Sequence, residues 1–311
     1  MTENTFKTPV LFLVFNRPST ARRVWEAIRR ARPERLFIAA DGPRLNKSED
    51  LAKCREVKDI VSLVDWPCEV KLLYREENLG CKLAISSAID WFFSQVEEGI
   101  ILEDDCLPDA TFFPYCQQML ARYRDDQRIM AVSGINLQFG RKRGDASYYF
   151  SKHIHVWGWA SWRRAWKHYD VTIKAWPQFR DGGYLKDLWH DDKKVQYWTR
   201  IYDFVYGGEI DTWDYQWEFA MWQQGALNVM PSVNLVSNIG FGSDSTHTDD
   251  THEVADLKLE PMIFPVKHPV FIIRDKEADD FTDSLVYTTG KPSLRVRALR
   301  KLKRLKKKLR I

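Results

Sequence analysis

The sequence contains few cysteines, and it has no metal-binding cysteine pair and no long apolar run. Its five cysteines stand at positions 54, 68, 81, 106 and 116 of 311 residues. An odd number without C-x-x-C spacing excludes a disulfide framework and a zinc site of that type. No stretch of ~18 apolar residues occurs, so we expect no membrane-spanning helix. The opening MTENTFKTP lacks the regions of a secretion signal, so we expect a cytoplasmic location.

The charge is distributed unevenly along the chain. The formal net charge is +4, but residues 291–311 hold eleven Lys and Arg and no acid, which leaves 36 basic against 43 acidic residues elsewhere. An acidic body argues against a basic nucleic-acid-binding protein, so we expect no nucleic-acid partner. The hydrophobic content of 44% and charged content of 29% are those of a globular protein and exclude disorder.

Strand and helix patterns alternate through the first 130 residues. Short apolar runs predict strands at 10–15, 35–40, 70–74, 99–102 and 129–133, with helices over 21–32, 48–63, 80–95 and from after 109 to about 123. Ser19-Thr20 can cap the first of these helices. This alternation predicts an α/β fold with a mostly parallel sheet and helices on both faces. Such sheets bind ligands beyond the carboxyl ends of their strands. Polar residues follow three expected strands: Asn16-Arg17, Asp41 and Glu103-Asp104-Asp105.

After residue 135 the alternation stops and tryptophan becomes frequent. Ten of the thirteen tryptophans lie between Trp157 and Trp222. Such a cluster indicates either a packed aromatic core or a surface on which sugar rings stack, and both interpretations can hold for different tryptophans. We expect this half to continue the same sheet and not to form an independent domain.

The acidic triplet Glu103-Asp104-Asp105 carries the strongest local signal. Three consecutive acids after a buried strand repel one another unless a cation or hydrogen-bond donors neutralise them. Carboxylate oxygens suit Mg²⁺ or Mn²⁺, which also bind substrate phosphates. A solvated acidic turn is the alternative.

Several motifs in order resemble one known enzyme family. The segment I-I-L-E-D-D-C-L-P-D-A-T-F-F-P-Y resembles the metal-binding segment of inverting glycosyltransferases of the N-acetylglucosaminyltransferase I type. The opening P-V-L-F-L-V-F-N-R-P-S-T resembles the first strand of that family, but Asn16 replaces its acid and only Arg17 carries over. Further motifs resemble its G-x-G-W segment, its base-containing W-D pair and its closing loop: Val156-Trp157-Gly158-Trp159, Trp213-Asp214, and Phe241-Gly242 followed by Ser245-Thr246-His247. The resemblance spans about residues 8–250 and implies a GT-A, Rossmann-like fold.

The resemblance also implies a reaction and a division of the chain. It indicates metal-dependent inverting transfer from a UDP-sugar to a hydroxyl of a glycan or glycolipid, with Mn²⁺ or Mg²⁺ as cofactor. Residues 1–135 would bind the nucleotide sugar and 136–290 the acceptor. We expect Asp105 to hold the metal and Glu103 and Asp104 to bind ribose and sugar hydroxyls.

The other donor-side residues have simpler alternatives. Asp41 matches the acid that contacts uracil, although it also suits a turn before Gly-Pro. Arg17 can bind phosphate or base, or lie on the surface at a helix entry. His247 can bind the metal or the diphosphate, or be a surface residue. Asn78 is interpreted as a helix cap.

Inverting transfer requires a base, and the resemblance favours Asp214, with Asp211 in reserve. On a helix, Asp211, Asp214 and Glu218 would share one face. Such spacing also describes a solvated acidic face. Nearby tryptophans predict a buried segment, in which an acid needs a partner or a role.

Two other functions are compatible with the sequence. A sugar nucleotidyltransferase shares the sheet and acids, but its glycine-rich loop is missing from F-N-R-P-S-T. A non-catalytic, membrane-docked carbohydrate-binding protein is the third possibility.

In residues 291–311 one set of apolar positions is spaced 4, 4, 3 and 4 and forms a single helical stripe. This stripe predicts a basic amphipathic helix on an anionic membrane and a peripheral location at its inner face. A disordered basic tail is the alternative. The five residues of this stripe are Leu294, Ala298, Leu302, Leu305 and Leu309.

Overall fold

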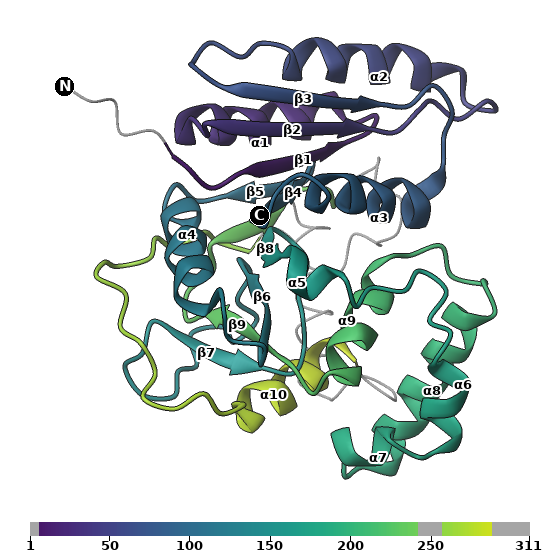
Figure 1. Cartoon of the computed structure of the whole chain (residues 1–311), viewed down its shortest axis with the longest axis vertical. Coiled ribbons are helices and arrows are strands. Elements are labelled where there is room, and N and C mark those ends of the chain that lie inside the picture. The colour runs from purple at the N-terminus through teal and green to yellow at the C-terminus, as the bar shows by residue number, and fades with distance from the viewer. Residues whose placement is uncertain (1–5, 242–256, 288–311) are drawn as a thin grey trace, which may run out of the picture.

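The computed structural model describes residues 6–241 and 257–287 (Figure 1). One sheet has the strand order β3-β2-β1-β4-β8-β6-β9-β7, and a second pairs β10 with β5. The strands are β1 (Val10–Val14), β2 (Arg35–Ala40), β3 (Glu69–Tyr74), β4 (Glu98–Glu103), β5 (Cys106–Pro108), β6 (Ile129–Ser133), β7 (Tyr148–Ser151), β8 (Trp159–Trp162), β9 (Leu227–Pro231) and β10 (Val236–Asn238). The helices are α1 (Pro18–Ala31), α2 (Ser48–Val61), α3 (Gly80–Phe93), α4 (Phe112–Tyr123), α5 (Arg163–Trp166), α6 (Trp176–Asp181), α7 (Leu185–Leu188), α8 (Asp192–Tyr206), α9 (Asp214–Gln223) and α10 (Lys276–Val286).

The large sheet is mostly parallel, which confirms the predicted α/β class. Strands β3, β2, β1 and β4 run in one direction, and β6 and β9 share it because β8 is antiparallel to both β4 and β6. Strand β7 is antiparallel to β9. The chain adds β2 and β3 on one side of β1 and β4 on the other. The order of strands therefore reverses between β1 and β4, where open α/β sheets bind their ligands.

Every strand and helix predicted in the first 130 residues is present, but the start of α1 differs. This helix begins at Pro18 and not at Ala21, and no side chain caps it. The Thr20 hydroxyl instead donates to the Arg17 carbonyl (3.2 Å). Proline favours the first turn because its fixed φ fits the helix and its missing N–H is not needed there.

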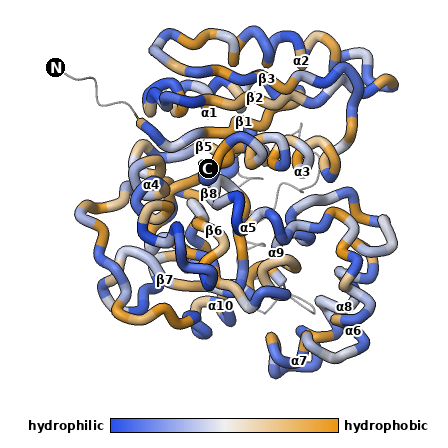
Figure 2. Tube along the Cα trace, in the orientation of Figure 1, coloured by the Kyte–Doolittle hydropathy of each residue, from blue (hydrophilic) through white to orange (hydrophobic). Residues whose placement is uncertain are grey.

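Helices cover both faces of the sheet, as predicted. Alternate residues of β1 enter different apolar clusters: Val10, Phe12 and Val14 pack on the side of α1, whereas Leu11 and Leu13 pack on the side of α3. Figure 2 shows hydrophobic residues along the central strands and hydrophilic ones on the outer helices. Burial from both sides explains why these strands appear as uninterrupted apolar runs, since each fully buried large side chain contributes ~1.5–3 kcal/mol.

The tryptophan-rich half continues the sheet through β6, β8, β9 and β7 and adds a third apolar cluster around α6, α8 and α9. Nine of its ten tryptophans are buried, so packing is their role: Trp159, Trp162, Trp166, Trp176, Trp189, Trp198, Trp213, Trp217 and Trp222. The tenth, Trp157, is only partly buried and meets Phe241 edge to face at 5.5 Å. Within this cluster, a sugar-stacking role therefore stays open for Trp157.

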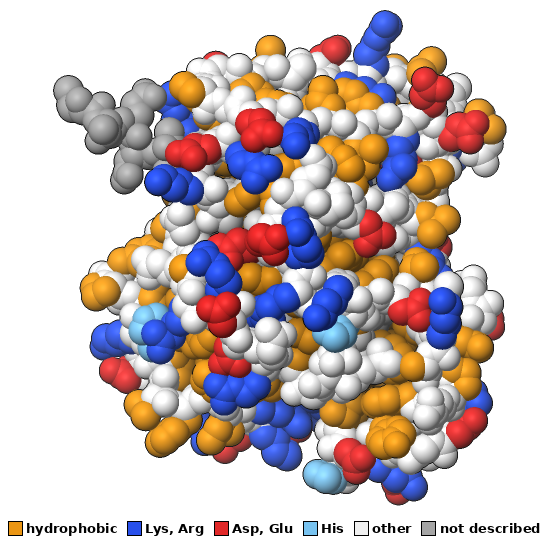
Figure 3. Space-filling model, in the orientation of Figure 1, with side chains coloured by type: hydrophobic (Ala, Val, Ile, Leu, Met, Phe, Trp, Pro, Cys, Tyr) orange, Lys and Arg blue, Asp and Glu red, His pale blue; other side chains and the backbone are white. Residues whose placement is uncertain are grey.

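The predicted basic tail over residues 291–311 lies outside the described residues. Within residues 6–241 and 257–287, no helix combines the length and the apolar character needed to cross a bilayer. Figure 3 shows basic and acidic side chains intermixed on one face of the molecule.

Candidate functional site

The acidic triplet and Arg17 lie together at the reversal of strand order. In the pairing of β1 with β4, Leu13 is opposite Glu103, so Asp104 and Asp105 lie just beyond the carboxyl end of the sheet. Arg17 directly precedes α1 and reaches the same place from the end of β1. Its Nη1 lies 2.6 Å from Asp105 Oδ2 and 3.5 Å from Asp104 Oδ1. The structure thus brings together residues that the sequence separates by almost ninety positions.

Asp104 is held in place from two sides. Its Oδ2 accepts the Phe15 N–H at 3.0 Å, while its Oδ1 faces Arg17. The side chain is buried, and desolvation raises the pKa of Asp104 to about 7 although Arg17 opposes the shift. These contacts fix the end of β4 against the end of β1, and they orient the triplet.

Negative charge is concentrated around Glu103. Desolvation raises the pKa of Glu103 well above its usual range, and the charges of Asp105, Asp104 and Asp214 raise it further. Arg17 acts in the opposite direction. Asp214 therefore lies within the electrostatic reach of the triplet, although the chain places it more than a hundred residues away. Such an excess of carboxylates favours an additional cation.

Asp211, Asp214 and Glu218 do not share a helical face, so that prediction is wrong. Helix α9 begins at Asp214, and Asp211 lies before it. The Asp211 oxygens accept the Cys81 and Lys82 N–H groups, each at 3.2 Å. They stabilise the start of α3, where a helix carries partial positive charge.

Glu218 accepts a hydrogen bond from the buried imidazole of His153, with 2.8 Å between Oε1 and Nδ1. The charge of Asp214 acts on Glu103 of the triplet. Its Oδ1 accepts from the Thr212 hydroxyl and the Tyr215 N–H. Its Oδ2 has no hydrogen-bond partner within the described part of the chain, so this oxygen is available to a ligand.

Asp41 connects β2 to the start of α3. Its carboxylate accepts from the Leu79 N–H (3.0 Å), the Gly42 N–H (2.9 Å) and the Asn78 amide (2.8 Å). Desolvation raises the pKa of Asp41, and these backbone donors oppose the shift. The capping role of Asn78 was wrong, because its amide binds Asp41 and the Gly42 carbonyl instead of a helix end. The contact of Asp41 with a uracil stays a prediction.

Gly240 contacts Asp105, and the sequence did not predict this contact. A Cβ on Gly240 would lie 2.4 Å from Asp105 Oδ2, so only glycine allows the backbone to approach this carboxylate so closely. The Ile239 N–H also donates to the Asp105 carbonyl (2.8 Å). Both contacts follow from the pairing of β10 with β5, which no local pattern predicted.

The donor set suits a divalent ion that the substrate helps to hold. Over the described ranges, no three His, Cys, Asp or Glu side chains converge into a complete metal cluster. His247, the second expected ligand, lies outside those ranges. Mg²⁺ and Mn²⁺ commonly use one or two carboxylates together with phosphate oxygens. Asp105, beside an excess of negative charge, fits that arrangement.

Comparisons with known proteins gave distant structural likenesses. No family model and no curated protein matches this chain. The crystal structure of HddC from Yersinia pseudotuberculosis gives a TM-score of 0.31 at 11% identity and covers 50% of this chain and 77% of its own. The crystal structure of UDP-glucose pyrophosphorylase complexed with UDP-glucose gives a TM-score of 0.25 at 13% identity and covers 47% of this chain and 62% of its own. The crystal structure of mouse xyloside xylosyltransferase 1 gives a TM-score of 0.34 at 11% identity and covers 68% of this chain and 80% of its own. These low scores leave the chemistry to be argued from the side chains.

Proposed function

We propose that this protein is a metal-dependent inverting glycosyltransferase that moves a sugar from a UDP-sugar to a hydroxyl of a glycan or glycolipid. One observation carries the proposal: the triplet and Arg17 meet where the strand order reverses, and the charge of Asp214 acts on Glu103 there. This constellation combines groups for a diphosphate, a divalent cation and a proton. The resemblance of motifs described above gives the same assignment.

The donor would lie across the ends of β1 and β4. Arg17 offers a planar donor to the diphosphate. Asp105 would hold Mn²⁺ or Mg²⁺, with His247 as a second ligand, and the ion would neutralise charge on the leaving diphosphate. Glu103 and Asp104 are assigned to sugar and ribose hydroxyls, and Asp41 to the uracil.

Asp214 is assigned as the general base. The acceptor oxygen forms a bond to the anomeric carbon from the side opposite the diphosphate, and its proton passes to Asp214 Oδ2. The bond from the anomeric carbon to the diphosphate oxygen breaks, and UDP leaves with that electron pair. Thr212 and Tyr215 hold Oδ1 and thereby orient the carboxylate.

The basic tail supports a location beside the acceptor. Eleven Lys and Arg between residues 291 and 311 would hold the enzyme on an anionic leaflet. A lipid-linked glycan at the cytoplasmic surface would then be within reach.

Calorimetric binding of UDP in the presence of Mn²⁺ tests the donor site. Asp105→Asn should weaken this binding at least ~10-fold. Glu98→Gln is the matched control because Glu98 begins the same strand β4 and pairs with Arg124 on the surface (2.7 Å). Equal binding by the parent and Asp105→Asn would refute the metal assignment.

A further inference from the structure

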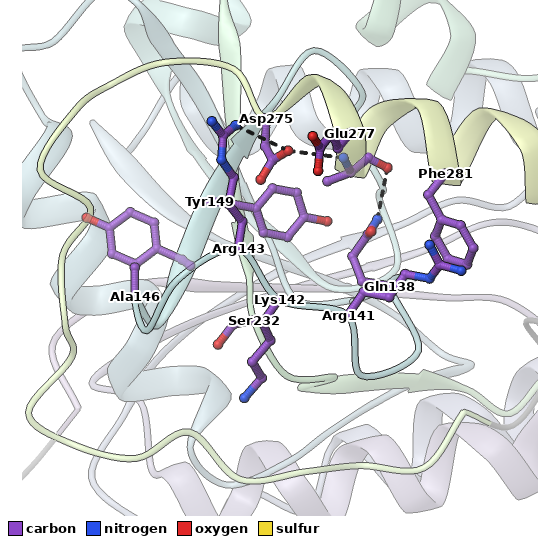
Figure 4. A pocket seen from close by; sticks show the side chains of 12 residues that line it. Gln138, Arg141, Lys142, Arg143, Ala146, Tyr149, Ser232, Asp275, Glu277 and Phe281 are labelled. Carbon is purple, nitrogen blue, oxygen red and sulfur yellow. Dashed lines mark hydrogen bonds and ion pairs between the residues drawn. The ribbon is translucent and has the colours of Figure 1, made fainter.

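A hollow lies beside the start of β7, and the residues of the acidic triplet do not line it (Figure 4). Its volume is about 170 Å³, and its walls come from the loop after β6, from β7 and from the first turns of α10. We call it the basic pocket because three consecutive cations, Arg141, Lys142 and Arg143, line it. Tyr149 and Gln138 add a phenol and an amide.

The sheet connects the basic pocket to the triplet. Tyr148 at the start of β7 is opposite Pro231 at the end of β9, so the pocket lies at the carboxyl edge of the sheet, as the triplet does. Ser232, in the pocket wall, begins the segment that runs through β10 to Gly240 beside Asp105. Ser232 and Gly240 are eight positions apart in the chain, so their Cα atoms lie no more than roughly 29 Å from each other. An extended ligand can therefore occupy both places.

Two of the three cations already have partners in the wall. Arg143 lies 3.7 Å from Asp275, which also accepts the Ala278 N–H at the start of α10. The guanidinium of Arg141 lies over the Phe281 ring at 4.0 Å. Lys142 has no ion-pair partner in residues 6–241 and 257–287. The pocket thus has one ammonium without an ion-pair partner in the described residues, beside two guanidinium groups that contact its wall.

Size and charge define the ligand. About 170 Å³ is smaller than the ~300–1,000 Å³ of pockets that enclose drug-sized ligands, which favours a single sugar unit over a whole nucleotide. Three cations outnumber the two carboxylates of the lining, Asp275 and Glu277. An anionic oxygen group is the complement of such a wall.

We propose that the basic pocket binds an acidic sugar unit of the acceptor, through its carboxylate or phosphate, while another part of the acceptor presents its hydroxyl to Asp214. The proposal rests on the proposed function and adds that the acceptor is an anionic, extended glycan. Lys142 binds the anion directly, and Arg141 and Arg143 supply the surrounding positive charge. Gln138 is held by the Ala278 carbonyl and the Thr282 hydroxyl, both at 3.0 Å, and keeps the pocket in shape.

Calorimetry with the full chain tests this site without a donor. The probes are a hexamer of galacturonic acid, a phosphorylated hexasaccharide and the neutral hexamer of glucose. We expect an anionic hexamer to bind at least ~10-fold more tightly than the neutral one. Replacing Arg141, Lys142 and Arg143 by Gln should remove that preference, and Lys142→Glu alone should reduce it. The anion that binds identifies carboxylate or phosphate as the recognised group.

The matched control removes the same charge elsewhere: Lys306, Lys307 and Lys308, in the tail, become Gln. We expect this variant to keep the preference. An equal loss in the two triple variants, or no preference in the parent, would overturn the proposal. UDP binding with Mn²⁺ is measured on all variants and should not change, because the pocket is separate from the donor site. If the parent protein itself does not bind UDP in the presence of Mn²⁺, the proposed function is contradicted instead.

Discussion

Arg17 and Asp105 form an ion pair of 2.6 Å across the ends of two neighbouring strands, although 88 positions separate them in the chain. The guanidinium also faces Asp104 at 3.5 Å. Arg17 thus neutralises carboxylates that would otherwise repel one another, at the point where the strand order reverses. The pair explains how three consecutive acids remain folded at the edge of a buried sheet.

Replacing Arg17 should make the fold depend on divalent cations. Arg17→Gln leaves the carboxylates of Asp104 and Asp105 without this donor, and we expect a loss of roughly 1–3 kcal/mol in the free energy of unfolding. Mn²⁺ should restore more stability to this variant than to the parent, because it replaces the missing positive charge. Thermal melting with and without Mn²⁺ measures both effects. Arg29→Gln, which breaks an exposed pair with Asp65, is the control and should show no gain from Mn²⁺. Equal gains in all three proteins would contradict the role of Arg17.

Asp214 and Asp211 should separate into catalysis and stability. Asp214→Asn should lower turnover at least ~10²-fold with UDP binding unchanged, as expected for the loss of a general base. Asp211→Asn should lower the melting temperature more than Asp214→Asn, because Asp211 binds two N–H groups at the start of α3. Steady-state kinetics and melting curves give the two readouts. A large loss of turnover in Asp211→Asn, with Asp214→Asn active, would move the base to Asp211.

Gly240→Ala should disturb Asp105 without removing it. The added methyl would lie 2.4 Å from Asp105 Oδ2, so the carboxylate or the segment after β10 must move. We expect UDP binding in the presence of Mn²⁺ to weaken at least ~10-fold, while the melting temperature changes little because the site lies at the sheet edge. Calorimetry with UDP measures the first and thermal melting the second. Unchanged binding would show that the approach of Gly240 is not needed.

The local sequence predicted the first half of the fold well, because β1, β2 and β4 are buried apolar runs and short loops join the alternating strands and helices. It did not predict the pairing of β5 with β10, since that contact joins Cys106 to Asn238 across the chain. For the same reason Gly240 was missed. The spacing of Asp211, Asp214 and Glu218 predicted one helical face, but such a spacing is compatible with a helix without requiring one. The start of α9 at Asp214 and the attraction of Asp211 to α3 are tertiary effects.

A buried charge cluster should make stability depend on pH. His153 lies between Glu218 Oε1 and Asp283 Oδ1, each at 2.8 Å, and these carboxylates raise the pKa of His153 to about 9 against the opposing effect of desolvation. Because the pKa of His153 is higher in the folded than in the unfolded protein, its protonation adds roughly 3 kcal/mol to the free energy of unfolding below about pH 6.5. This contribution is lost as the pH rises through 9. Desolvation lowers the pKa of Lys152 to about 7. The contribution of Lys152 to stability therefore increases as the pH rises above about 7, opposite to that of His153.

The difference between variants isolates the histidine. We expect the gap in unfolding free energy between the parent and His153→Gln to be larger at pH 6.5 than at pH 9.5, by about the same 3 kcal/mol. Urea unfolding at both pH values measures it. His190→Gln, at an exposed position, is the control and should show a constant gap. A constant gap for His153→Gln would show that the imidazole is not charged in the folded protein.

The basic tail should attach the protein reversibly to anionic membranes. We expect the full chain to sediment with phosphatidylserine vesicles at low salt and to be released at high salt, because the attraction is electrostatic. A variant with the lysines and arginines of residues 291–311 changed to glutamine should remain in the supernatant. Sedimentation of both proteins, or of neither, would remove the membrane proposal.

Product analysis with UDP-sugars tests the central claim most directly. The parent is incubated with Mn²⁺, a panel of UDP-sugars and an oligosaccharide acceptor, and the products are separated. We predict release of UDP together with a glycosylated acceptor of inverted anomeric configuration, and a loss of at least ~10²-fold in Asp214→Asn but not in Glu98→Gln. Pyrophosphate formed from UTP and a sugar phosphate, with no UDP from any UDP-sugar, would contradict the account and identify a nucleotidyltransferase.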